Sequence, residues 1–332
     1  VTVTNNAVIN TTQNASPGII AVSIGGGGGV AVLPQDSVVS YGLNKGSGNG
    51  GDVVVNVNAN INTSGNGSDG VDAMSIGGGG GLMLYNNGLL VEGGAGRGTA
   101  GEISVSVAPN VYILTGGAGS TAIRVMQVNG RDDPVVNIAP GAVVIGGPGG
   151  AGVSISGAIN HVNNNGYLGT YDGINGRSIV SLSGSTTVNN SGISVGDIRL
   201  AGAGNVINNL SAGRMYVINH PDIGVDGVLN NSGYLQYNPS GFSNTGVMNH
   251  TGTLMQSSTG ILGMKFDHHG TSADQISIQP GGIMNLAGRI SPVLMNAGLI
   301  SPGSVQKNII SNAGGTLVAD QLGTVSTAIM GF

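Results

Sequence analysis

The carboxylates and histidines that could carry acid–base chemistry fall in three short segments of this sequence. They are Asp132 with Asp133, Asp222 with Asp226, and Asp267 with His268 and His269. Clustered carboxylates on one face are the acid and base of many polysaccharide lyases and hydrolases. Neighbouring residues of a strand point to opposite faces, so Asp132 and Asp133 can act together only from a loop. Because the chain also has no tryptophan to stack on sugars, we expect no catalytic residues.

Two further segments match catalytic or cofactor motifs. Residues Gly96–Gly101 fit the dinucleotide pattern G-x-G-x-x-G, but a strand-like segment follows where a helix is needed. Residues Gly192–Gly196 fit the nucleophile elbow G-x-S-x-G, which requires a strand-to-helix turn that is not readable here. We interpret the serine as lying on a strand between two glycine turns, and we expect no cofactor.

Metal-ligand chemistry is also suggested by two sets of residues. Ser64–Asp72 is one glycine short of a calcium-binding nonapeptide, but one imperfect copy cannot form a paired site, so we interpret Asp69 and Asp72 as solvated turn residues. The histidines show no ligand spacing, and we expect turn or surface positions and no metal site. They are His161, His220, His250, His268 and His269.

Tyrosines offer a different kind of site. Several of them stand beside asparagine-rich turns, where they could form a contact stripe or simply cover the end of a coil. These are Tyr167, Tyr171, Tyr234 and Tyr237.

The elements that must position these residues are predicted by an internal repeat. The block SIGGGGG occurs at Ser23–Gly29 and again at Ser75–Gly81, and a shift of 52 residues also aligns the segments before each block. A degraded third copy runs from Glu102 through Thr115-Gly-Gly to Ile123–Val128, with a slip of one or two residues. Repeats of this size indicate a solenoid.

Composition selects the class of solenoid. Glycine supplies 64 of 332 residues and only 8% are charged, yet 39% are hydrophobic and alternate with period two in runs such as Val53–Val57 and Ile103–Val107. Glycine and asparagine interrupt every stretch of helical length. We therefore predict an all-β, right-handed parallel β-helix in one elongated rod.

Asparagine-rich turns indicate where the expected coils begin. They precede apolar segments throughout the second half and could stack in hydrogen-bonded ladders. With coils of about 20 to 25 residues, we expect roughly 13 to 16 turns and a rod of roughly 60 to 80 Å. The turns are Asn163-Asn-Asn-Gly, Asn189-Asn-Ser-Gly, Asn230-Asn-Ser-Gly, Ser243-Asn-Thr-Gly, Asn249-His-Thr-Gly and Met295-Asn-Ala-Gly.

The glycine blocks supply no side chains to a core, so we expect them to project as loops. Replacing a block with serines is then predicted to leave folding intact and to alter only association.

Charge and hydropathy limit the partners. A net charge of −5 spread over this length forms no basic stripe, which argues against nucleic acid. No run of about 20 apolar residues exists, so we expect no membrane span in this chain. The absence of cysteine is compatible with export through an oxidising compartment.

The glycine blocks, the Asn-Asn-x-Gly turns and the segments Gly270–Ile278 and Asn296–Gly303 together resemble the passenger domains of bacterial autotransporters, which are type V secreted proteins. The resemblance covers roughly residues 1–318. It implies a right-handed parallel β-helix on the outer surface of a Gram-negative bacterium or released from it, with a role in adhesion, aggregation or host contact. The membrane barrel of that family would follow such coils, and we expect none within this chain.

We divide the chain into N-terminal coils with glycine blocks (1–130), central coils with Asn-Gly turns (131–269) and C-terminal passenger-like coils (270–332). The expected function is that of a non-enzymatic extracellular adhesin or scaffold, whose partners are further copies of itself or glycans and proteins of a host surface. Two alternatives stay open. A self-assembling filament subunit is suggested by strand-like sequence that begins at Val1, and a carbohydrate-active enzyme would need three or more carboxylates in one groove.

Overall fold

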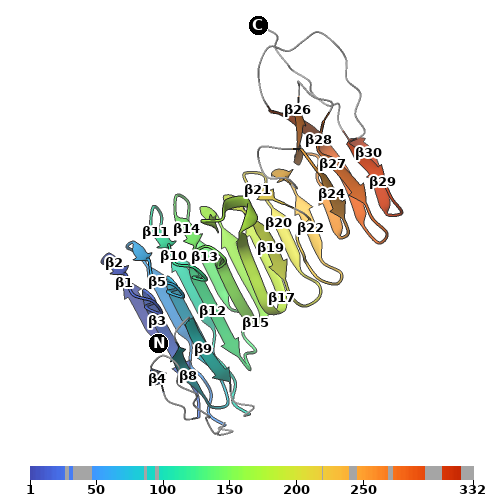
Figure 1. Cartoon of the computed structure of the whole chain (residues 1–332). Coiled ribbons are helices and arrows are strands. Elements are labelled where there is room, and N and C mark those ends of the chain that lie inside the picture. Colours follow the sequence, from blue (N-terminus) through green and yellow to red (C-terminus); the bar gives the residue numbers. More distant parts are fainter. Residues whose placement is uncertain are drawn as a thin grey trace.

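The computed structural model describes residues 1–26, 30–32, 47–85, 88–93, 97–218, 220–238, 245–267, 272–295 and 309–322. Within them the chain forms a parallel β-helix, as predicted, in which three strand positions per coil each build a face (Figure 1). The one helical element described is a short 3-10 turn, η1 (Gly173–Asn175).

The first face is a continuous parallel stack. Each strand pairs with its equivalent one coil earlier and one coil later, so the alternation of apolar and polar residues puts the same side of every strand inward. Its strands are β1 (Thr2–Asn5), β5 (Val53–Val57), β10 (Ile103–Val107), β13 (Val135–Ile138), the second part of β15 (Ala151–Asn164), the second part of β17 (Arg177–Asn190), β20 (Val206–Asn209), β22 (Val228–Asn231), β25 (Thr253–Gln256), the first part of β28 (Ile283–Met295) and β30 (Thr316–Leu322).

The second face follows each first-face strand after a short corner. It is also parallel and in register from end to end. Its strands are β2 (Ile9–Thr11), β6 (Ile61–Thr63), β11 (Tyr112–Thr115), β14 (Val143–Gly146), β16 (Tyr167–Thr170), β18 (Ile193–Val195), β21 (Arg214–Val217), β23 (Tyr234–Tyr237), β26 (Ile261–Asp267) and the second part of β28.

The third face is built in two stretches. The first comprises β3 (Ile19–Ile24), β7 (Val71–Ile76), β12 (Ile123–Val128), the first parts of β15 and β17, and β19 (Asp197–Leu200). The second comprises β24 (Val247–His250), β27 (Gln275–Ile278) and β29 (Ile310–Asn312). In the coil between them, Asp222 makes only an isolated bridge to Arg199.

Coil length varies although register is kept. Thr2 pairs with Val54, 52 residues later, whereas Thr187 pairs with Val206, only 19 residues later. The predicted period of about 52 is therefore confirmed for the first coils. The expected turn count is wrong, because eleven described strands stack on the first face, and ten steps of about 4.8 Å give roughly 48 Å.

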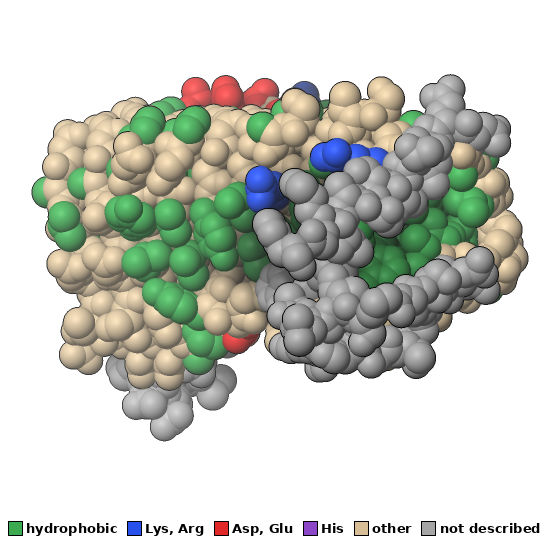
Figure 2. Space-filling view, turned by 90° about the horizontal axis from the view of Figure 1, so that it is seen from above, with side chains coloured by type: hydrophobic (Ala, Val, Ile, Leu, Met, Phe, Trp, Pro, Cys, Tyr) green, Lys and Arg blue, Asp and Glu red, His purple; other side chains and the backbone are tan. Residues whose placement is uncertain are grey.

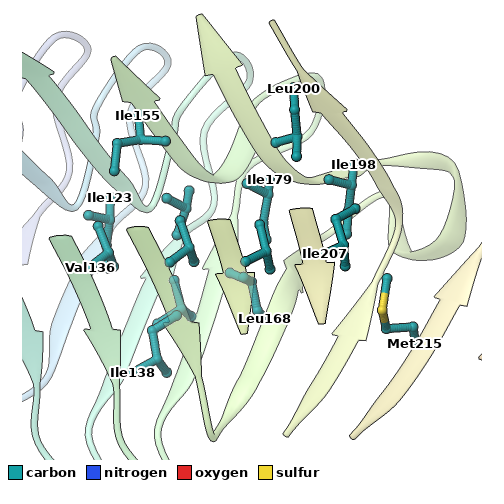
Figure 3. Packing of buried hydrophobic residues seen from close by; sticks show 14 of the residues in the cluster. Ile123, Val136, Ile138, Ile155, Leu168, Ile179, Ile198, Leu200, Ile207 and Met215 are labelled. Atoms are coloured by element: carbon teal, nitrogen blue, oxygen red, sulfur yellow. The ribbon is translucent and has the colours of Figure 1, made fainter. Parts of the chain in front are cut away.

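Small aliphatic side chains from all three faces fill the interior. Figure 3 shows Ile123, Val136 and Leu168 pointing inward from the third, first and second face. All three are fully buried. The runs predicted as strands at Val53–Val57 and Ile103–Val107 are β5 and β10, so the period-two pattern identified the core correctly.

Asparagines form the predicted ladders at the end of the first-face strands. In the outer ladder each amide donates to the preceding coil, as Asn189 does to Asn163 at 2.9 Å. In the inner, fully buried ladder each amide donates to the following coil, as Asn190 does to Asn209 at 2.9 Å. The outer ladder is Asn137, Asn163, Asn189, Asn208 and Asn230, and the inner is Asn164, Asn190, Asn209, Asn231 and Gln256.

The two ladders stabilise the stack in different ways. Each inner amide also donates to a second-face carbonyl, as Asn209 does to Tyr234 O at 3.0 Å, so it ties two faces together at the corner. Because the ladders run in opposite directions along the stack, their amide dipoles oppose one another. The predicted turns at Ser243 and after Met295 lie outside the described residues.

The glycine blocks stack on each other, which confirms the repeat. Ser23 pairs with Ser75, and Ser75 in turn with Gln127 of the predicted third copy. The expectation of projecting loops is wrong for the start of each block. A side chain on Gly25 or Gly77 would collide with the backbone of the segment that runs back toward the first face.

The later glycines of the second block serve another purpose. Gly80 and Gly81 begin β8 (Gly80–Tyr85), which pairs with β9 (Gly88–Gly93) in antiparallel and with β4 (Val30–Val32) in parallel orientation. This small sheet lies beside the coils (Figure 1). Each block therefore joins a tightly packed corner to an inserted sheet. The block at Ser23 is described only as far as Gly26.

Gly77→Ala is expected to lower the free energy of unfolding by about 2 kcal/mol, because the added methyl group meets backbone atoms of Gly98, Thr99 and Ala100 that cannot rotate away. Chemical denaturation followed by circular dichroism measures the change. Gly51→Ala is the control, since its methyl group would make only an ordinary 3.4 Å contact with Ser23 Oγ. Equal stability of both variants would mean that the block is not a packing element.

Asn209→Ala is expected to cost about 3 kcal/mol, because Asn190 and Asn231 then face an unpaired buried position in the inner ladder. Asn208→Ala, one residue earlier in the half-exposed outer ladder, should cost less than about 1 kcal/mol. Similar losses in the two variants would contradict the assignment of the inner ladder as the stronger support.

Candidate functional site

The outward side of the second face carries an apolar stripe, which Arg214 interrupts in one of its two columns. Tyr112, Val143 and Tyr167 are stacked directly on one another in register. We define the second-face stripe as Tyr112, Leu114, Val143, Ile145, Tyr167, Ile193, Tyr216, Tyr234 and Ile261. Its members are exposed or half-buried, with Tyr112 the most open at 42%. From β11 to β26 the six steps span about 29 Å.

Figure 2 looks down on the side of the molecule where the labels of β11, β14 and β21 lie in Figure 1. Hydrophobic side chains gather there in a band that runs along the stack. Scattered apolar residues are normal on a surface, but a contiguous band with a polar surround marks an interaction site.

The corner glycines explain why the stripe is straight. A glycine immediately precedes six successive outward residues, and a side chain on most of these glycines would collide with a carbonyl oxygen of the preceding coil. The backbones of successive coils therefore stack closely at this corner. As a result, the residue after each glycine lies at the same outward position in its coil. The glycines are Gly166, Gly192, Gly213, Gly233, Gly260 and Gly288.

Two tyrosine rings lean across the sheet and rest over glycines of the same strand or the next coil. A Cβ on Gly169 would lie 3.5 Å from Tyr167 Cε1, and one on Gly263 would collide with the Tyr234 hydroxyl. The Tyr234 hydroxyl donates to Gln236 Oε1 at 2.8 Å. The ring is thereby held against the surface, and burial with the nearby Tyr216 raises the pKa of Tyr234 to about 12.

Sequence reasoning found this stripe in part. Tyr167 and Tyr234 belong to it, whereas Tyr171 lies beyond the end of β16 and Tyr237 is fully buried, with its pKa raised by burial. The aliphatic members, Tyr112 and Tyr216 were missed. The glycine that precedes Tyr167, Ile193, Tyr234 and Ile261 was a signal that could have found four of the nine members.

The acidic candidates do not converge. Asp133 and Asp226 each stand two residues before an equivalent first-face strand, β13 and β22. Four coil steps separate these strands, which is about 19 Å and well beyond the separation of two glycosidase carboxylates, roughly 5 to 9.5 Å. Asp132 and Asp222 are exposed beside them. The side chain of Asp267 and residues His268 and His269 lie outside the described residues.

The two segments that match catalytic or cofactor motifs form strands and corners of the β-helix. Ile193–Val195 is β18, and Ser194 is buried with its hydroxyl 3.1 Å from Ser178 Oγ, so it lies on a strand as predicted. In the dinucleotide-like segment, Gly98 and Gly101 pack against the backbone of the coil before, and a strand follows. Gly96 lies outside the described residues.

Asp69 and Asp72 are buried, so the interpretation as solvated turn residues was wrong. Arg124 of the next coil lies 2.5 Å from Asp69 Oδ2 and 3.6 Å from Asp72 Oδ1. Burial raises the pKa of Asp69, and burial together with the Asp69 charge raises that of Asp72 well above its usual range. The Arg124 guanidinium is the cation that these carboxylates contact, so the cluster cross-links β7 to β12.

A second buried ion pair lies near the C-terminal coils. Lys265 Nζ is 3.7 Å from Asp274 Oδ1, and the Lys265 backbone N–H donates to Asp274 Oδ2 at 2.9 Å. Burial lowers the pKa of Lys265 and raises that of Asp274. The pair fastens the loop between β26 and β27 to the coil.

Two of the histidines are buried, which corrects their expected surface positions. The rings of His220 and His250 meet edge to face with centroids 4.5 Å apart, where the third face changes from its first stretch to its second. His220 Nδ1 lies 2.8 Å from Pro221 O, and His250 Nε2 lies 2.9 Å from Ile283 O. His161 is half-exposed, 3.6 Å from Asp133.

The described ranges contain neither a metal-ligand cluster, which would need three histidine, aspartate or glutamate side chains together, nor a helix long enough to cross a membrane. No protein-family model, curated protein or solved structure matches the chain. The second-face stripe is the candidate site, because its apolar side chains are aligned on the outward side of successive coils.

The histidine pair is expected to contribute a loss of stability on acidification. Burial lowers the pKa of His220 to about 3 and also lowers that of His250, so between about pH 6.5 and 3 these two histidines bind more protons in the unfolded chain than in the folded one. His220 alone should cost roughly 2 kcal/mol between about pH 6.5 and 4.5. Urea unfolding at a series of pH values measures this loss. His220→Gln should reduce it and His161→Gln should not, and an unchanged pH dependence in His220→Gln would refute the assignment.

Proposed function

We propose that this chain is a non-enzymatic, extracellular β-solenoid of the autotransporter-passenger type that acts in adhesion, aggregation or surface scaffolding. The observation that carries the proposal is the second-face stripe. An outward apolar band held in register over successive coils offers the same contact many times, and repeated weak contacts add up to firm attachment.

Two further features support this proposal. Stacked coils fixed by two amide ladders make a stiff support, and a stiff support keeps the repeated contacts aligned. Asp133 and Asp226 lie about 19 Å apart along the stack, which is too far for a shared acid–base step. The resemblance in the glycine blocks and asparagine turns agrees with surface display.

The triple variant Tyr112→Ser, Tyr167→Ser, Tyr234→Ser is expected to reduce attachment of protein-coated beads to epithelial cells, and bead clumping, by roughly tenfold. Bead counting by microscopy and sedimentation provides the readout. Tyr171→Ser is the matched control, because this tyrosine is 53% exposed but lies outside the stripe. If the triple variant keeps its circular dichroism spectrum and attaches like the unmodified chain, the stripe is not the contact surface.

A further inference from the structure

Two arginines stand within the line of the second-face stripe. Arg214 occupies the outward position between Ile193 and Tyr234, and Arg289 follows Ile261 in the same column. Arg214 and Arg289 are both exposed. Within the described ranges neither is within ion-pair distance of a carboxylate, whereas Arg124 and Arg199 each have an aspartate partner.

The stripe is locally positive on a chain with a net charge of −5. The two outward columns of the second face from β11 to the second part of β28 contain no aspartate or glutamate. Arg214 and Arg289 are three coil steps apart, which is about 14 Å. Complementarity therefore favours an extended partner that carries negative charges at wide intervals.

The backbone of this face has no free strand edge with which such a partner could form hydrogen bonds. Strands β14, β16, β18, β21 and β23 are each paired on both edges. A peptide that adds as a further strand would need a free edge, so recognition must come from side chains. Nucleic acid is also disfavoured, because it carries a phosphate charge about every 1.7 Å and needs many more cations than two.

The side chains that remain suit sugars. Tyrosine rings that lie over Gly169 and Gly263 present an apolar face to solvent, against which the apolar face of a sugar ring can stack. The Tyr216 and Tyr234 rings, with centroids 5.8 Å apart, extend this platform next to Arg214. A guanidinium pairs with a carboxylate through two parallel hydrogen bonds.

We propose that the second-face stripe binds an extended acidic polysaccharide along the axis of the stack, with neutral sugars over the tyrosines and carboxylates on Arg214 and Arg289. This inference rests on the proposed function and names the partner class of the same surface. The partner is a polymer in which carboxylated sugars alternate with neutral ones, since a fully charged chain would place most of its carboxylates opposite apolar residues.

The test uses hyaluronate, whose carboxylated and neutral sugars alternate, and the same polymer with its carboxyl groups reduced to alcohols. Binding to the full chain is measured by biolayer interferometry at low and high salt. Arg214→Gln with Arg289→Gln is expected to weaken hyaluronate binding at least about fivefold and to flatten its salt dependence. Arg199→Gln removes the same charge from the third face and should change affinity less than about twofold.

Loss of affinity on carboxyl reduction together with the arginine effect supports the inference. Equal binding of the two polymers, unchanged binding by the double arginine variant, or no binding of hyaluronate by the unmodified chain overturns it. The bead assay distinguishes the two proposals. If the triple tyrosine variant loses attachment but the double arginine variant keeps it, adhesion through the stripe is supported and only the acidic polysaccharide is ruled out as the partner. Melting curves of each variant establish that it is folded.

Discussion

Parallel pairing at one strand spacing per coil is the constraint on which the rest of this structure depends. Every backbone group of a coil must meet its equivalent above and below, about 4.8 Å away. Coil length is free only where the chain leaves the faces, so coils of 52 and of 19 residues share one register. The extra residues of the long coils are placed outside, and β4, β8 and β9 show where they go.

The same constraint decides which residues a corner can hold. Where two backbones approach closely, as at Gly77 or Gly166, only hydrogen fits in place of a side chain. Where the corner is wider, a buried amide such as Asn209 bridges two faces and its neighbours above and below. Glycine is thus abundant because it permits close approach of two backbones at a corner, and asparagine because its amide bridges two faces and successive coils.

Two groups of buried charges are each held together by ion pairs. Arg124 accompanies Asp69 and Asp72, and Lys265 accompanies Asp274. The Arg124 cluster links β7 to β12 of the next coil, whereas Lys265 and Asp274 are nine residues apart and fasten the loop between β26 and β27. The stripe on the second face depends on the register of the stack, because each coil places its outward residue beside that of the next coil.

The sequence by itself determined the class of fold, the repeat, the strands of the core and the asparagine ladders. These follow from local chemistry, because alternation assigns the sides of a strand and identical blocks must occupy equivalent positions. The position of Tyr167 and Tyr234 beside asparagine-rich turns suggested a contact stripe, with the covering of a coil end as the alternative.

Only the tertiary structure decided the rest. The burial of Asp72, His220 and Tyr237, the packing of Gly77 and the separation of Asp133 from Asp226 all depend on which residues of neighbouring coils lie opposite one another. That register depends on the unequal numbers of residues in the coils. The length of a coil is set by how many residues lie outside the stack between two strands, and no local sequence pattern reveals this number.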